Sequence, residues 1–126
     1  MKTNIVCRLQ VEGIHNWSEA SKFEPTMKYL EYPHRHMFHI EVKKEVFHDD
    51  RDVEFIVFKR KIKKYLEKKY YSTEYDCCDF GGQSCEMLAH ELYTEFDLCH
   101  CSVFEDNENG AEVTGYVDTF WSSTTV

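Results

Sequence analysis

Two histidines that share one face of an expected strand are the residues of this chain whose types and spacing point most directly to chemistry. His34 and His36 open a run that continues through Phe38, Ile40 and Val42. Side chains two apart on a strand point to the same side of the sheet, so both imidazoles project together. Neutral imidazole nitrogens are the commonest protein ligands for zinc. The pair predicts part of a metal site, with a polar strand end as the alternative.

A third histidine follows the first strand of the chain. Residues 5–12 alternate apolar and polar side chains, which is typical of a half-buried strand, and the same parity runs on to His15. If this strand and the next are antiparallel neighbours, the end of one lies beside the start of the other. A catalytic zinc needs three protein ligands and one open position. We therefore predict a zinc site formed by His15, His34 and His36.

The overall composition limits the classes of partner. The chain has 126 residues, enough for one domain with a hydrophobic core, and a formal net charge of −8, which does not favour nucleic acid. The first residues lead directly into a strand, and no run is apolar and long enough for a secretory signal or a membrane span. We expect a cytoplasmic protein with no membrane or nucleic-acid partner. Its six cysteines are then expected to be reduced thiols.

The expected elements alternate between strands and helices without a regular βα repeat. We predict strands over residues 5–12, 38–46, 53–57, 98–105 and 111–117, and helices over 58–70 and from Ser84 as a cap to about 96, with a loop over 72–82. This order favours an α+β fold, with an antiparallel four- to five-stranded sheet and two helices on one face. The domain spans residues 1–117, and residues 118–126 form a C-terminal tail.

Several short motifs occur in an order that matches a known family. They are His15, His34–Phe38, Ile56–Phe58 before a helix, Gln83–Ala89 at a helix start, and Cys101–Glu105. On these motifs the chain resembles the 6-pyruvoyl- and 6-carboxy-tetrahydropterin synthases. The family pattern has a histidine ending the first strand, a His-Gly-His pair opening the second, and a late glutamate. The resemblance covers residues 4 to about 113, although Arg35 replaces the central glycine.

The resemblance implies a fold, an assembly and an activity. It implies the tunnelling fold (T-fold), in which subunits associate as a homo-hexamer (or trimer) so that their sheets close into a barrel. It also implies a zinc-dependent lyase of queuosine or tetrahydropterin biosynthesis, acting on dihydroneopterin triphosphate or a related GTP-derived pterin. Glu105 matches the glutamate that binds the ring edge, where a carboxylate can accept two parallel N–H bonds. Ser84 matches a family threonine near the ring, with a plain helix cap as the alternative.

The departures from the family pattern concern the residues that move protons. The family's cysteine position is occupied by Leu30, and Glu31, one residue further on, is the best remaining candidate for a catalytic base. The Asp-His pair expected after the first helix is absent from residues 73–76. The alternative function is therefore a non-catalytic pterin- or nucleotide-binding protein that keeps the zinc pocket but has lost turnover.

Overall fold

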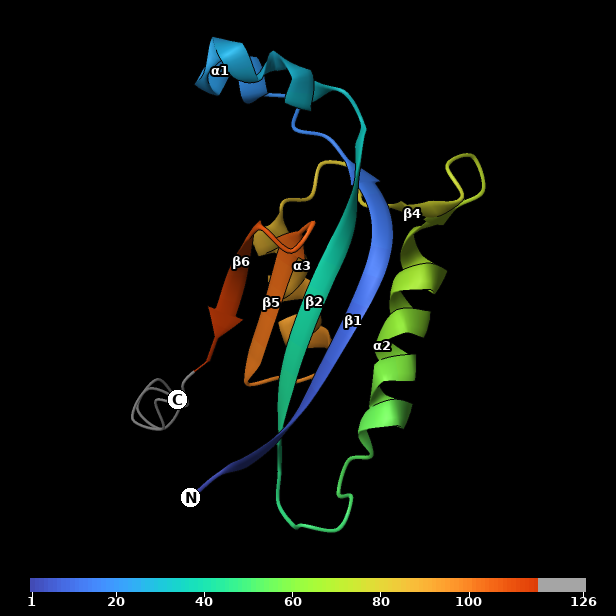
Figure 1. Cartoon of the computed structure of the whole chain (residues 1–126), viewed down its shortest axis with the longest axis vertical. Helices are drawn as coiled ribbons and strands as arrows, with labels where there is room; N and C mark the ends of the chain where they lie inside the picture. Colours follow the sequence, from blue (N-terminus) through green and yellow to red (C-terminus); the bar gives the residue numbers. More distant parts are fainter. Residues whose placement is uncertain (116–126) are drawn as a thin grey trace.

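A computed structural model of the chain describes residues 1–115 and has a mixed α+β architecture (Figure 1). One open, mostly antiparallel sheet contains six strands in the order β3-β4-β1-β2-β5-β6. The strands are β1 (Thr3–His15), β2 (His34–Val46), β3 (Tyr71–Ser72), β4 (Cys77–Asp79), β5 (His100–Glu105) and β6 (Asn109–Thr114). The tail expected over residues 118–126 lies outside the described residues.

The two long strands β1 and β2 form the centre of the sheet. They pair antiparallel along their whole lengths, from Thr3 opposite Val46 to His15 opposite His34. The expected alternation holds in β1, where Cys7 and Leu9 are buried and Arg8 and Gln10 are exposed. The prediction that the end of the first strand lies beside the start of the second is confirmed.

Two main helices pack on the same face of this sheet. Helix α2 (Phe55–Tyr70) buries Phe58, Ile62 and Leu66, and helix α3 (Cys85–Glu95) buries Cys85, Leu88, Ala89 and Leu92. All seven belong to one hydrophobic core with inward-facing residues of β1, β2 and β5. Ser84 caps α3 by accepting a hydrogen bond from the Met87 N–H at 3.2 Å, as expected. The prediction of two helices on one face is confirmed.

Two local predictions are wrong. Residues 53–57 form no strand, because Glu54 caps α2 by accepting from the Val57 N–H, and the helix begins at Phe55. The expected loop over 72–82 contains most of a short hairpin, β3 with β4. Strand β4 also runs parallel to the end of β1, opposite Gly13 and Ile14. These two short strands raise the count to six and make the sheet only mostly antiparallel.

The connection between β1 and β2 leaves the body of the sheet. It contains helix α1 (Ala20–Phe23) and the 3₁₀ helix η1 (Pro25–Glu31), which project beyond the end of the sheet in Figure 1. The two ends of this connection are joined by a hydrogen bond from the Trp17 N–H to the Leu30 carbonyl, at 2.7 Å. The connection therefore returns to the point where β1 ends and β2 begins.

The second face of the sheet is not covered by α2 or α3. We call it the open face; its side chains include Arg8, Glu12 and Arg35, which are exposed, and His39 and Glu41, which are half-buried. It lines a groove of about 710 Å³, to which Lys59 and Lys63 of α2 also contribute. Within residues 1–115, no helix has the length and apolar character needed to cross a membrane.

Candidate metal centre

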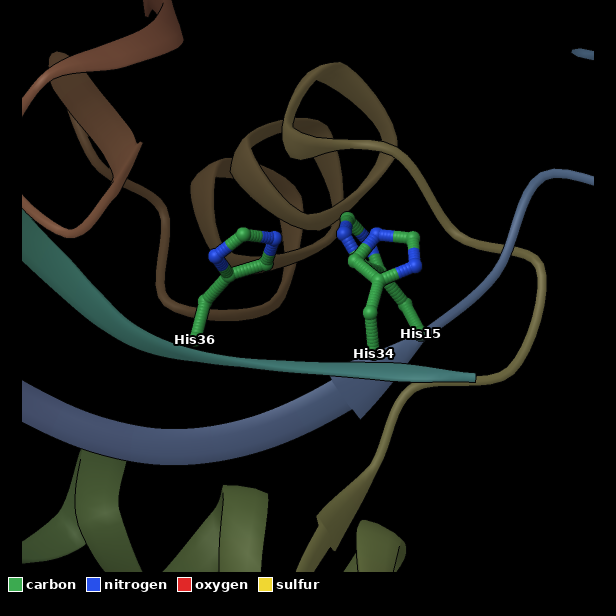
Figure 2. A group of neighbouring side chains, drawn as sticks. All are labelled: His15, His34 and His36. Atoms are coloured by element: carbon green, nitrogen blue, oxygen red, sulfur yellow. The ribbon is translucent and has the colours of Figure 1, made fainter. Parts of the chain in front are cut away.

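Three histidines converge on the helix-covered face at one end of the β1–β2 pair. His15 is the last residue of β1 and lies opposite His34, the first residue of β2, while His36 lies opposite Gly13. Their ring centroids are 4.6 to 5.4 Å apart. One ring nitrogen from each lies within 4.8 Å of the others, and Figure 2 shows all three rings rising from the two strands toward the same side. These side chains could together hold a metal ion.

The Nδ1 atom of each ring lies within hydrogen-bond distance of an oxygen. The Nδ1 atom lies 2.9 Å from the Gln83 carbonyl in His15, 2.9 Å from the Tyr32 carbonyl in His34, and 2.7 Å from an Asp106 carboxylate oxygen in His36. A carbonyl or carboxylate oxygen only accepts, so each Nδ1 carries the proton. An Nδ1 bonded to an oxygen, with Nε2 left to face the ion, is the arrangement found in metal-binding histidines. The Nε2 atoms of His15 and His36 face the Glu105 carboxylate, so a metal bound there would replace any proton that they share with it.

The burial of His15 favours its metal-binding form. Burial lowers the pKa of His15, against the opposing effects of the Gln83 carbonyl and the Glu105 carboxylate. The imidazole is therefore neutral near pH 7, and only a neutral imidazole can donate its lone pair to a metal. Phe38, which is completely buried, lies edge-on below His15 with ring centroids 5.3 Å apart. The histidines thus stand on an apolar floor and face away from it.

A carboxylate lies directly beside the three imidazoles. Glu105, the last residue of β5, places one oxygen 2.9 Å from Nε2 of His15 and the other 3.5 Å from Nε2 of His36. Its side chain is about one third exposed. If a metal ion takes the Nε2 lone pairs, Glu105 loses these partners and both of its oxygens become available to another molecule. The predicted role of Glu105 in binding the ring edge of a substrate stays a prediction.

A cleft of about 540 Å³ opens next to this cluster. This volume is within the range of small-molecule sites. The walls combine the ends of β1 and β5 with the start of α3 and the β1–β2 connection. The lining residues are His15, Asn16, Trp17, Leu30, His34, Gly82, Gln83, Ser84, Cys85, Glu86, Met87, Glu105, Asn109 and Gly110.

Ser84 and Cys85 bring the start of α3 into the cleft. Ser84 lines the cleft and also caps the helix, so both sequence interpretations of this residue remain compatible with its position. Cys85 is buried, and burial together with the neighbouring Glu105 raises the pKa of its thiol to about 12. Cys85 is therefore a protonated thiol rather than a nucleophile.

Glu31 is not brought to the cleft. Its carboxylate accepts hydrogen bonds from the Ser21 N–H, at 2.8 Å, and from the Ser21 hydroxyl. These bonds lower the pKa of Glu31 below its ordinary value. Leu30, its neighbour, lines the cleft instead. The catalytic role predicted for Glu31 stays a prediction, and reaching the cleft would require the carboxylate to leave Ser21.

A hydrogen-bond network supports the segment that holds His15. The Gln83 side chain donates to the Tyr70 hydroxyl at 2.6 Å, and Tyr70 donates to Glu91 of α3. Glu91 also accepts from the Tyr65 hydroxyl and from the Lys69 ammonium group, at 2.6 and 2.7 Å. The network joins both main helices to the residue whose carbonyl orients His15.

The sequence reasoning missed the partners that orient the histidines. Gln83 and Tyr32 act through backbone carbonyls, for which no side-chain pattern exists. Asp106 follows Glu105 in an expected turn, and its role appears only once the pairing of β2 with β5 brings it to His36. Trp17 was also missed, although a tryptophan two residues after a candidate ligand is a usable signal for a cleft wall.

In sequence comparisons the chain matches no protein-family model and no curated protein. The geometry alone therefore defines the site, as three convergent imidazoles and a carboxylate beside a small-molecule cleft. Such a site can hold a metal ion and leave it accessible to a molecule in the cleft.

Proposed function

We propose that the chain is a zinc-dependent lyase of the pterin-synthase type. The observation that carries the proposal is the convergence of the His15, His34 and His36 ligand atoms beside Glu105, at the mouth of a cleft. These four residues are the ones on which the sequence resembles the metal-binding and ring-binding positions of the pterin synthases. The substrate would be a pterin derived from GTP, with an oxygen-bearing side chain.

Zinc suits this donor set better than most metals. Three imidazoles and one open position form the ligand set of catalytic zinc sites, and the hydroxyl and carbonyl groups of a pterin side chain are suitable fourth ligands. Bound zinc would supply Lewis-acid polarisation of such an oxygen. The Nδ1 partners of the three histidines fix the ring orientations before any metal binds, which is the part that the chain itself contributes.

Glu105 and the cleft walls would bind the ring. A carboxylate that accepts two parallel N–H bonds matches the amidine-like edge of a pterin. Trp17, Leu30 and Met87 provide apolar surface against which a flat ring can pack. Ser84 offers a hydroxyl at the start of α3. The ring would thus be held at one edge while its side chain extends toward the histidines.

The assembly belongs to the same proposal. A sheet with both helices on one face leaves its open face and its two edge strands, β3 and β6, available (Figure 1). Exposed edges are normally paired or covered, and closure of several T-fold sheets into a barrel would do this. We propose a homo-hexamer (or trimer). Light scattering tests it, and a monomer at micromolar concentration would contradict it.

The second candidate function is a binding protein without turnover. The position of Glu31 favours it, because this carboxylate faces Ser21 instead of the cleft. Cys85 does not replace it, since its thiol remains protonated near neutral pH. In this case the metal and the ring would still bind, and no product would form.

Calorimetry with dihydroneopterin and zinc-loaded protein tests the ring site. Glu105→Gln should weaken binding by roughly 2–5 kcal/mol, because an amide presents a donor to ring N–H groups and removes a charge-assisted pair. Glu108→Gln, an exposed change in the following turn, is the matched control and should bind normally. Product analysis then separates the candidates. Binding with turnover supports the lyase, binding alone supports the second candidate, and the absence of binding overturns both.

A further inference from the structure

His15 depends on a distant segment of the chain for its orientation. The Nδ1 partner of His34 is the carbonyl of Tyr32, only two residues earlier. His15 instead relies on the Gln83 carbonyl, 2.9 Å away, in the segment between β4 and α3. A shift of that carbonyl would turn the imidazole and redirect its Nε2 atom. Metal affinity is sensitive to the groups that orient ligand histidines, so whatever fixes Gln83 also acts on the metal centre.

The backbone around Gln83 gives its carbonyl little support. Two glycines precede it, and Gly81 has a positive φ of 59°. Glycine has more accessible backbone conformations than any other residue. The Gly81 carbonyl accepts from the Asn16 N–H at 2.9 Å, but Gly82 separates this contact from Gln83. The Gln83 N–H bonds only within its own turn, to the Phe80 carbonyl at 3.1 Å. The side chain of Gln83 is therefore the contact that joins this residue to a helix.

The side-chain contact of Gln83 has one possible direction. The Glu91 carboxylate only accepts hydrogen bonds, so the Tyr70 hydroxyl donates its one proton to Glu91. The Tyr70 oxygen then accepts from the Gln83 amide group, at 2.6 Å. Burial and the neighbouring Glu91 raise the pKa of Tyr70, so the hydroxyl keeps its proton near pH 7. Gln83 is thus bonded to a hydroxyl that has a single orientation.

Glu91 is itself held in place by two further donors. It accepts from the Tyr65 hydroxyl at 2.6 Å and from the Lys69 ammonium group at 2.7 Å. Its side chain is only 17% exposed, so water competes little for these bonds. Every member of the network belongs to the same chain. The network is therefore complete without a partner subunit.

We propose that Tyr70 is a positioning residue of the metal centre. It holds the Gln83 side chain, and the Gln83 carbonyl then keeps the His15 ring with Nε2 toward the ion. The Tyr70 ring also packs against Phe80, which packs against Phe38 beneath His15. Loss of the hydroxyl alone keeps this aromatic packing and isolates the hydrogen bond. The inference rests on the proposed zinc site and adds to it a residue that does not contact the metal.

Two tyrosine variants test the proposal through zinc affinity, measured by competition with a chelator on folded protein. Tyr70→Phe removes the acceptor of Gln83 and should weaken zinc binding by about three- to tenfold, less than the 10- to 100-fold typical of groups that contact a ligand histidine directly. Tyr65→Phe is the matched control, because it removes a hydroxyl from the same carboxylate and has no hydrogen bond to Gln83 in residues 1–115. It should bind zinc as the wild type does.

The possible results separate this inference from the proposed function. Equal losses in both tyrosine variants, or no loss in either, would overturn the inference, while zinc binding by the wild type would leave the proposed function standing. A wild-type protein that binds no zinc would overturn both.

A change on the other side of the contact keeps the test valid if Tyr70→Phe does not fold. Gln83→Met retains the length of the side chain and removes its donor, so it should weaken zinc binding by about the same factor. The losses should not add in the double variant, because both changes remove one contact. With cobalt in place of zinc, the visible spectrum reports the ligand geometry and should change in both variants but not in Tyr65→Phe. Additive losses or an unchanged spectrum would overturn the inference.

Discussion

The two faces of the central strands use polar residues in opposite ways. On the helix-covered face, His34 and His36 are partly buried, and each leaves Nε2 free of any carbonyl partner. On the open face, Arg35 stands between them and is neutralised by Glu12. Arg8 and Glu41 form a second pair there, at 3.6 Å. Adjacent residues of the same strand thus belong to very different environments.

The difference teaches where this chain concentrates interaction energy. An exposed ion pair on the open face loses hydration of both charged groups and is screened by salt, so it adds little to the stability of the fold. The histidine cluster lies over an apolar floor, where polar groups depend on fixed partners and where a bound metal would be poorly screened. Substitutions on the open face should therefore have small effects on stability and binding, and substitutions on the helix-covered face should have large ones.

Removal of the ligand histidines should have the largest effect. The wild-type protein is expected to hold one zinc per chain, and the double variant His34→Ala/His36→Ala should hold almost none, because one imidazole cannot retain the ion. Plasma mass spectrometry of purified protein measures this. His39→Ala changes a histidine of the same strand on the open face and should keep full zinc. Stoichiometric zinc in the double variant would refute the site.

Loss of the carboxylate that orients His36 should have a smaller effect on zinc binding. Asp106→Asn keeps an oxygen to accept from the Met37 N–H, and asparagine tolerates the positive φ of 53° at this position. Its amide NH2 group takes the place of the oxygen that accepts from His36 Nδ1, and an NH2 group cannot accept a hydrogen bond. Zinc affinity should fall by about 10- to 100-fold, as for other outer partners of metal-binding histidines. A competition titration with a zinc chelator measures it. Asn107→Asp, the neighbouring exposed residue, should leave the affinity unchanged.

The network behind the cleft predicts a dependence of stability on pH. Burial alone would raise the pKa of Glu91, but hydrogen bonds from Lys69, Tyr65 and Tyr70 outweigh it and lower the pKa below 4.5. The ionised group therefore stabilises the fold above pH 4.5, and this contribution is lost as the pH falls through the lowered value. Glu91→Gln should cost about 1–3 kcal/mol at pH 7.

Denaturant unfolding across this range measures the effect. Because the variant has no proton to bind at position 91, the free energy gap between it and the wild type should narrow below pH 4.5. A gap that stays constant with pH would show that Glu91 acts through packing alone.

The open face should give the smallest effect. Arg8 and Glu41 are linked by an ion pair in which the arginine side chain is 78% exposed. A double-mutant cycle with Arg8→Ala and Glu41→Ala should give a coupling energy below about 1 kcal/mol, and lower still at high salt. Urea denaturation of the four proteins measures it. A coupling as large as the effect of Glu91→Gln would remove the contrast between the two faces.

The sequence was most informative where the periodicity was long and regular. The alternation in residues 5–12, continued to residue 15, predicted that His15 points to the buried face of the sheet. The alternation in the second strand predicted the same face for His34 and His36, and the register of the two strands confirms this. The capping of α3 by Ser84 was likewise predicted from a local signal that depends on few neighbours.

The failures arose where short-range signals conflict with tertiary packing. The β-branched run at Ile56 and Val57 suggested a strand, but the cap at Glu54 and the spacing of Phe58, Ile62 and Leu66 favoured a helix that leaves both residues exposed. Strand β4 is too short to show an alternating pattern in the sequence, and it forms because the end of β1 pairs with it. The position of Glu31 depends on Ser21, ten residues earlier, through a contact that no pattern encodes.

The register of the central pair has a consequence for the connection between β1 and β2. His15 and His34 are the last partners of the ladder, so residues 16 to 33 form a closed loop that begins and ends at two of the candidate metal ligands. An ion bound to both would act as a reversible crosslink at the root of that loop. Opening the loop would then require either breaking metal bonds or unzipping the ladder from its far end, near Thr3 and Val46. Release of the ion would instead free the root first, together with Trp17 and Leu30, which form part of the cleft wall.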